Sequence, residues 1–373
     1  MNVKKRVVYY LSGFDPRGVH HYYSLYKENF NNQMTINGMK GTVSPRKNLH
    51  QWEIDATDQG IHVNTLYNFL SWDDIIRSEW SSGLLNYYKD LFYCIVAYLS
   101  NGLIIKYAKA SPKQMIAGLY PGFYLLGALV IAIYGSISLY QSIEGIIGIA
   151  SGIIFSILTM MLFEKIGNTI GVFWLLRIYA FSVRWGRGEI DTIEERINHF
   201  SDAIAIQLNI AEDVDEVLLI SHSVGTILAV SVLARILEKA DHLDKFGMIT
   251  LGECIPLVSF QPNADKYRAE LQKIAENKDI IWVDYTAPID GACFPLHDFM
   301  QSSSIQQSGM NLHYLSPRFH TLFDKITYAK LRRDWYTTHF LYLMSTEISG
   351  GYDYYKISAG AMSIRDKIDH LKS

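Results

Sequence analysis

The chain has 373 residues, of which 49% are hydrophobic, and its formal net charge at neutral pH is −3. Its lysines and arginines are scattered along the sequence, which excludes the long basic face that nucleic-acid binding requires. Its three cysteines have no paired short spacing, which predicts neither a disulfide framework nor a zinc site and fits a reducing compartment. The sequence has no phosphate-binding glycine loop, dinucleotide fingerprint or metal-spaced His/Cys cluster, so we expect no cofactor and no metal.

The N-terminal part of the chain predicts three strands and a helix. Residues 7–11 form an apolar run that is too short for a signal peptide and is soon followed by Asp15, so we interpret it as the first strand. The aromatic stretch 20–30 has helical character, whereas residues 51–57 and 61–70 have the composition of strands. The chain is therefore expected to begin as a strand, a loop and a helix.

Two long uncharged runs occupy the middle of the chain. Residues 115–140 are enough to cross a hydrocarbon layer of about 30 Å as a helix, and residues 145–163 reach the minimum length for a return crossing. Together they predict a transmembrane helical hairpin, and the alternative is a pair of buried core helices. Gly148 and Gly152 have the Gly-x-x-x-Gly spacing that lets helices approach closely, and the hairpin also offers a surface for oligomerisation.

Lysines and arginines precede the first of the two runs and follow the second, while the turn between the runs has none. They are Lys106, Lys109, Lys113, Lys165, Arg177, Arg184 and Arg187. Because lysine and arginine are enriched in cytoplasmic flanks, both outer sides are predicted to be cytoplasmic. We therefore expect an integral membrane protein with two transmembrane helices. Residues 1–110 and 189–373 would form one cytoplasmic soluble domain, and residues 111–188 the hairpin with an aromatic segment at the membrane interface or against that domain.

The C-terminal part alternates between helical and strand patterns. Apolar residues at helical spacing begin at Ile193 and predict a helix. Compact apolar runs follow at residues 217–220, 248–251 and 280–285, each separated from the next by enough sequence for a crossover. This alternation predicts an α/β fold with a mostly parallel sheet and helices on both faces.

The strongest motif is Ser221-His222-Ser223-Val224-Gly225, between a buried strand and an apolar helix. In a nucleophile elbow, the middle serine occupies a strained turn that lifts its hydroxyl above the sheet, and small flanking residues keep the strand and the helix from colliding. The chain here resembles the α/β-hydrolase superfamily, whose elbow is usually Gly-x-Ser-x-Gly, with Ser221 in place of the first glycine. The resemblance covers both soluble parts in outline and implies that Ser223 is the nucleophile. The alternative is an ordinary turn between strand and helix.

The resemblance also implies an acid and then a histidine after the nucleophile. Asp290 follows the predicted strand 280–285, in a loop at the sheet edge where active-site groups gather, and is favoured over Asp284 within the strand. Sequence spacing does not choose among the histidines that follow, His297, His313, His320 and His339. His339 is favoured because it precedes an apolar stretch near the C-terminal end, and His320 and His313 remain as alternatives.

Acyl transfer also needs two backbone N–H groups that stabilise the negative charge of the tetrahedral intermediate. We expect one from Val224, directly after the nucleophile, and the other from Phe14 in the glycine-containing loop after the first strand. Arg17 in the same loop would pair either with a substrate anion or with Asp15. His222 is not expected to be the base, because adjacent elbow residues point apart.

These features predict a membrane-anchored serine hydrolase with the fold of an α/β-hydrolase and an inserted transmembrane hairpin. Its expected substrates are small-molecule carboxylic esters or thioesters of lipids or acyl conjugates, because the hairpin holds the site near a bilayer. The alternative is a membrane-bound scaffold or binding protein that retains the fold without turnover, since one fold serves many functions. A third hypothesis is that the hairpin oligomerises or holds a partner and that hydrolysis is secondary.

Overall fold

The computed structural model describes residues 2–210 and 212–372 and divides into two compact units. The first, here called the sheet unit, combines Met1–Ser78 with Gly188–Ser373. The second, called the helical unit, is Glu79–Arg187. The chain therefore enters the sheet unit twice, before and after the helical unit.

The sheet unit is built on eight strands within its described residues, in the order β2-β3-β4-β1-β5-β6-β7-β8. Their bounds are β1 Lys5–Leu11, β2 Lys40–Val43, β3 Gln51–Asp58, β4 Ile61–Phe69, β5 Glu216–His222, β6 Phe246–Leu251, β7 Ile281–Tyr285 and β8 Asn311–Leu315. The pairs from β4 through β1 to β8 are parallel, whereas β2 and β3 form an antiparallel edge. The predicted mostly parallel sheet is confirmed.

The antiparallel edge follows from a tight turn. Gln59 and Gly60 join β3 to β4 with φ values of 50° and 82°, and positive φ at both central positions is typical of a two-residue hairpin. β2 and β8 were not among the predicted strands. β2 has four residues, of which only Val43 is buried, and all of β8 is only half-buried at the other edge, so neither has a clear apolar signal.

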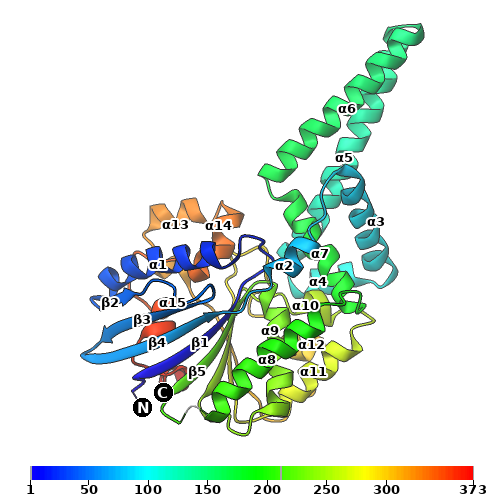
Figure 1. Cartoon of the computed structure of the whole chain (residues 1–373). Coiled ribbons are helices and arrows are strands. Elements are labelled where there is room, and N and C mark those ends of the chain that lie inside the picture. Colours follow the sequence, from blue (N-terminus) through cyan, green and yellow to red (C-terminus); the bar gives the residue numbers. More distant parts are fainter. Residues whose placement is uncertain (1, 211, 373) are drawn as a thin grey trace. The chain divides into compact units, whose positions relative to one another are not determined.

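Helices cover both faces of this sheet (Figure 1). One face carries α1 Gly18–Asn37, α15 Tyr354–Ala359 and α16 Ile364–Lys372, and the other carries α8 Ile193–Ile210, α9 Gly225–Lys239 and α11 Asp265–Ala275. Neighbouring side chains of β1 point to opposite faces of the sheet. The Tyr10 ring packs 5.7 Å from Tyr22 of α1, while the Tyr9 hydroxyl donates to the Ala203 carbonyl of α8 at 3.4 Å. Because both faces are covered, the central strand β5 is buried along its whole length.

The helical unit consists of five described helices: α3 Leu84–Ser100, α4 Leu103–Ala110, α5 Pro112–Ser142, α6 Gly145–Thr169 and α7 Val172–Gly186. It begins at Glu79, well before the boundary expected at residue 111, because α3 packs against α7. The rings of Tyr87 and Phe173 stack with centroids 3.9 Å apart, and Arg177 donates to the Tyr87 hydroxyl at 2.9 Å.

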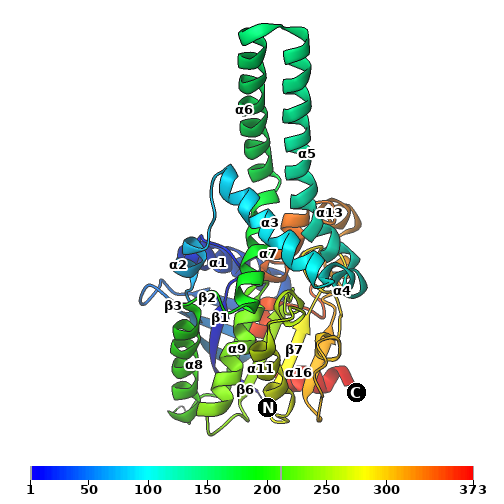
Figure 2. The ribbon, with the colours of Figure 1, turned by 90° about the vertical axis from the view of Figure 1, so that its right-hand side faces the viewer.

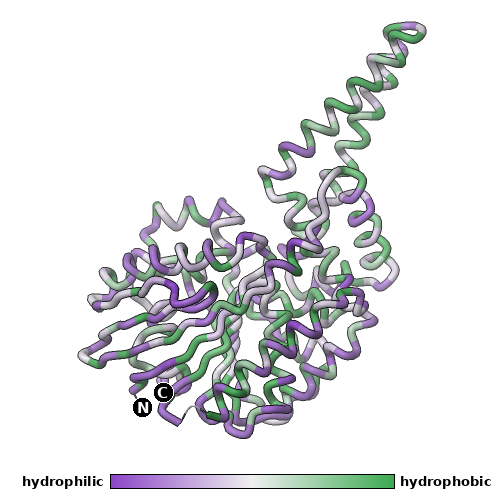
Figure 3. The backbone as a smooth tube through the Cα atoms, in the orientation of Figure 1, coloured by the Kyte–Doolittle hydropathy of each residue, from purple (hydrophilic) through white to green (hydrophobic). Residues whose placement is uncertain are grey.

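The helices α5 and α6, of 31 and 25 residues, are long and apolar enough to cross a membrane. They lie side by side in Figure 2 and are largely hydrophobic in Figure 3. Only 28% and 17% of their most apolar windows are buried, so most of these side chains face outward, as in membrane-spanning helices and unlike core helices. α3 and α4 are long and apolar enough to cross a membrane only if they are taken together as one broken span, and the angle between the two helices is 82°.

Small residues bring α5 and α6 together. The Ser136 hydroxyl donates to the Gly152 carbonyl at 2.7 Å and lies 2.6 Å from the Ser156 hydroxyl. A Cβ atom at Gly152 would come within 3.1 Å of the Ser136 carbonyl oxygen, a tight contact that the glycine avoids where the two helices meet. Gly148 instead packs against the turn, at the Ile143 carbonyl. The predicted role of small residues within the hairpin is therefore confirmed at Gly152.

Candidate active site

Ser223 occupies a strained turn between β5 and α9. Its φ is +55°, in a region that residues with a side chain rarely adopt. The turn is held because the Ser223 N–H donates to the Leu251 carbonyl at 2.9 Å and the Thr226 hydroxyl donates to the Ser223 carbonyl at 2.6 Å. Strain of this kind persists only where the surroundings fix it, and it is concentrated at functional sites.

Gly225 leaves the space that this turn needs. A Cβ atom at Gly225 would collide with the Ser12 carbonyl and come within 2.8 Å of the Leu11 carbonyl, so α9 can begin against the end of β1 only with glycine there. Ser221 takes the place of the usual first glycine. Its fully buried hydroxyl lies 3.4 Å from the Ile249 carbonyl, so the extra side chain fits.

The structure brings Ser223, His339 and Asp290 together. The Nε2 atom of His339 lies 2.7 Å from the Ser223 Oγ, and its Nδ1 lies 2.9 Å and 3.1 Å from the two carboxylate oxygens of Asp290. The three side chains come from the turn after β5, from α14 (Trp335–Phe340) and from the loop after β7. All three are at most 3% exposed. The buried serine hydroxyl, imidazole and carboxylate are thus connected in that order by hydrogen-bond contacts.

The other predicted candidates lie elsewhere in the sheet unit. Asp284 is inside β7, where it accepts a hydrogen bond from the Thr250 hydroxyl at 2.6 Å, and burial raises its pKa to about 7. His313 is in β8 with its Nε2 atom 2.7 Å from Asn311 Oδ1. The ring of His320 packs edge-on against Tyr328, and His297 lies 2.8 Å from the Ser302 hydroxyl.

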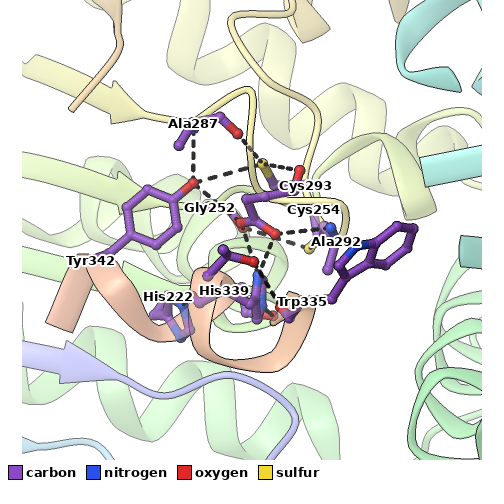
Figure 4. Close-up of polar contacts among 12 residues, drawn as sticks. His222, Gly252, Cys254, Ala287, Ala292, Cys293, Trp335, His339 and Tyr342 are labelled. Atoms are coloured by element: carbon purple, nitrogen blue, oxygen red, sulfur yellow. Dashed lines mark hydrogen bonds and ion pairs between the residues drawn. The ribbon is translucent and has the colours of Figure 1, made fainter. Parts of the chain in front are cut away.

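The Asp290 carboxylate is held from several sides, and Figure 4 labels its partners Ala292, His339 and Tyr342. The Ala292 N–H donates to Oδ1 at 2.9 Å, and the Tyr342 hydroxyl donates to Oδ2 at 3.2 Å. Burial by itself raises the pKa of Asp290, but the charge of His339 and the hydrogen bonds from His339 and Ala292 outweigh it, so the pKa is lowered. The carboxylate therefore stays ionised and can fix the tautomer of the imidazole.

His222 holds the backbone of His339, a role that the sequence did not predict. Its Nε2 lies 2.8 Å from the His339 carbonyl oxygen, and the two rings are 4.8 Å apart. Burial, followed by the neighbouring His339, lowers the pKa of His222 to about 3. The neutral ring therefore donates its Nε2 hydrogen to that carbonyl at physiological pH.

This buried histidine should make folding sensitive to acid. The folded pKa lies below the unfolded value of about 6.5, so at intermediate pH only the unfolded state binds the proton. The stabilisation is complete above pH 6.5 and is lost as the pH falls toward 3, by about 2 kcal/mol between pH 7 and pH 5. We expect His222→Gln, which keeps a neutral donor, to show a flatter decline of thermal midpoint over that range in detergent. An identical decline in both proteins would contradict the assignment.

The loop after β1 lies against Ser223 and contains Phe14. A Cβ atom on Gly13 would come within 3.3 Å of the Ser223 Oγ, and Trp72 anchors the loop by donating from Nε1 to the Ser12 carbonyl at 3.0 Å. Phe14 follows Gly13 and packs against Trp72. On the other side of Ser223, no described group accepts a hydrogen bond from the Val224 N–H.

Replacing Gly13 with alanine tests how tightly this loop fits. The added methyl group would lie 2.9 Å from the Ser223 Cβ and displace the hydroxyl. Because misplacing a reacting group by about 1 Å costs on the order of 100-fold, reaction of Ser223 with an electrophile should slow by that factor. Stopped-flow or gel-based labelling rates measure it. Gly351→Ala is the matched control, since nothing lies within 4 Å of its Cβ position, and it should react at the wild-type rate.

Arg17 pairs with Asp15, one of the two partners considered for it. Its Nε atom lies 2.8 Å from both carboxylate oxygens, and the Tyr22 hydroxyl donates to the same carboxylate at 3.1 Å. The guanidinium also lies over the Phe340 ring, 5.5 Å from its centroid. Arg17 thus braces the loop after β1 against the residue next to His339.

Among the described residues, no group of three or more His, Cys, Asp or Glu side chains is arranged to hold a metal ion. The contacts among Ser223, His339 and Asp290 are the basis for the function proposed below. Comparison of the chain with protein-family models, curated proteins and solved structures finds no match in any of the three.

Proposed function

We propose that this protein is a membrane-anchored serine hydrolase that cleaves carboxylic ester or thioester bonds. The observation that carries the proposal is the hydrogen-bonded series from the Ser223 Oγ through the His339 ring to the Asp290 carboxylate, with distances of 2.7 Å and 2.9 Å. A serine is a weak nucleophile unless an adjacent base takes its proton, and a base of this kind is effective when a third group orients it. This series supports Ser223 as the nucleophile, His339 as the base and Asp290 as the group that orients the base.

The proposed reaction has two steps. Ser223 attacks the carbonyl carbon while His339 Nε2 takes the hydroxyl proton, and the Val224 and Phe14 N–H groups stabilise the oxyanion. His339 then protonates the leaving alcohol or thiol, which leaves an acyl group on Ser223. In the second step, His339 takes a proton from water, the resulting hydroxide attacks the acyl carbonyl, and the acid leaves as Ser223 regains its proton. Asp290 remains ionised and stabilises the imidazolium in both steps.

The substrate class is inferred from the helical unit. A hydrolase on a chain with two candidate membrane spans encounters lipids and acyl conjugates at high local concentration, so lipid esters and acyl thioesters are the proposed substrates. The cations that flank the spans support a cytoplasmic location for the sheet unit.

Labelling with a fluorophosphonate tests the proposal directly. The full-length protein in detergent should form a covalent adduct, and peptide mass spectrometry should locate it on Ser223. Heat-denatured protein should not react, because activation depends on the folded site. If the folded protein fails to label while a control serine hydrolase labels in the same detergent, the proposal is wrong and the scaffold alternative replaces it.

A further inference from the structure

The segment directly before His339 forms an exposed surface that the proposed reaction does not use. It consists of α13 (Lys325–Leu331), the connection that follows it and the start of α14. None of the residues of α13 is buried. The helix rests on the core of the sheet unit through the half-buried Tyr328 and Leu331, and the side that carries Lys325, Ile326 and Lys330 is exposed.

This surface carries both cationic and apolar side chains. The cations are Lys325, Lys330, Arg332 and Arg333, and the exposed apolar residues are Ile326, Trp335 and Tyr336. Ile326 is 71% exposed, and the two aromatic residues are each about half exposed. Within the described chain, no carboxylate forms an ion pair with any of the four cations.

The nearby carboxylates are occupied by the backbone. Asp324 accepts hydrogen bonds from the Ile326 and Thr327 N–H groups at 2.7 Å and 3.1 Å, and Asp334 accepts one from the Thr337 N–H at 3.0 Å. These contacts cap α13 and α14, so the two acids shape the segment while its four cations remain available to an outside partner. Residues 325–336 contain Asp334 as their one acid, and Asp324 and Glu347 contact the segment at Thr327, so four cations face three carboxylates and the surface keeps a net positive charge.

We propose that residues 325–336 dock on the surface of an anionic phospholipid bilayer. Lysine and arginine are attracted to anionic headgroups, and isoleucine, tryptophan and tyrosine enter the boundary between headgroups and acyl chains. The same chain carries two candidate spans whose flanking cations predict that the sheet unit faces the anionic cytoplasmic leaflet. Docking does not depend on the proposed hydrolysis, so it should also occur in Ser223→Ala.

A probe on Ile326 tests this proposal. The three native cysteines are buried, so a polarity-sensitive thiol probe should label Ile326→Cys selectively in the full-length protein. The labelled protein is placed in nanodiscs of phosphatidylcholine alone or with phosphatidylserine, with brominated acyl chains as quenchers. We expect a blue shift and quenching in the anionic discs, both reduced by high salt. A probe at the exposed Glu276, which precedes β7 and so lies at the amino-terminal end of the parallel strands, is the control and should show neither.

Charge removal separates docking from mere proximity. Because each cation near an anionic surface contributes about fivefold to binding, changing Lys325, Lys330, Arg332 and Arg333 to glutamine should reduce docking by several hundredfold. The proposal is overturned if the Ile326 probe behaves like the Glu276 probe in both kinds of disc. It is also overturned if quenching is equal in neutral and anionic discs, or if the glutamine variant is quenched as strongly as the wild type.

Discussion

Replacing Ser223 with alanine should lower kcat for ester hydrolysis by on the order of 10⁴- to 10⁶-fold. The change removes the attacking oxygen but leaves the turn, because the hydrogen bonds that hold it come from the Ser223 backbone. Initial rates with a short-chain aryl ester, in detergent and then in nanodiscs, measure the loss. The oxyanion donors would remain, so residual activity above the uncatalysed rate is expected.

A matched control guards against loss of the fold. Ser221 is buried next to this turn and its hydroxyl has only a weak contact at 3.4 Å, so Ser221→Ala should keep most of the activity. If Ser223→Ala retained more than a tenth of the wild-type rate, Ser223 could not be the nucleophile.

Removal of His339 should have an effect of similar size, because the nucleophile and its base act as one unit. His339→Ala would leave the Ser223 hydroxyl without a proton acceptor at 2.7 Å, and both fluorophosphonate labelling and ester hydrolysis should fall by on the order of 10⁴-fold or more. The same assays as for Ser223→Ala measure this effect.

His313→Ala and His320→Ala are the matched controls for this result. Both residues follow Asp290 in the sequence, but the structure places His313 in β8 and His320 against Tyr328. Each variant should label at close to the wild-type rate. Loss of labelling in either of them, with His339→Ala still reactive, would show that the wrong histidine has been assigned as the base.

The buried parts of the sheet were predictable because their signals are local. β5 contains the apolar run 217–220 and passes directly into the Ser223 turn and the apolar α9, so strand, turn and helix were visible within one stretch of sequence. The two helices of the hairpin were equally clear, since a span requires a long uncharged run. β2 and β8 were missed because edge strands that are half-exposed lack such a run.

The candidate site was only partly predictable. Ser223 followed from its motif, and Asp290 from its place after β7, but several histidines were compatible with the expected chain order. Three-dimensional packing distinguishes them, since α14 carries the His339 ring to Ser223 across 116 residues of sequence. The contact from His222 to the His339 carbonyl spans a similar separation and has no sequence signature at all.

The division of the sheet unit into two stretches of chain has a consequence for biosynthesis. β1 pairs with β4 within the first stretch, but its other neighbour, β5, belongs to the second, after both candidate spans. At roughly 5–20 residues per second, on the order of ten seconds separate the synthesis of Ser78 from that of Gly188. During that interval one edge of β1 is unpaired, and an exposed apolar strand edge invites aggregation. Prompt insertion of α5 and α6 would hold the nascent chain at the membrane. The unpaired edge of β1 would then be kept away from other unfinished chains until β5 is synthesised.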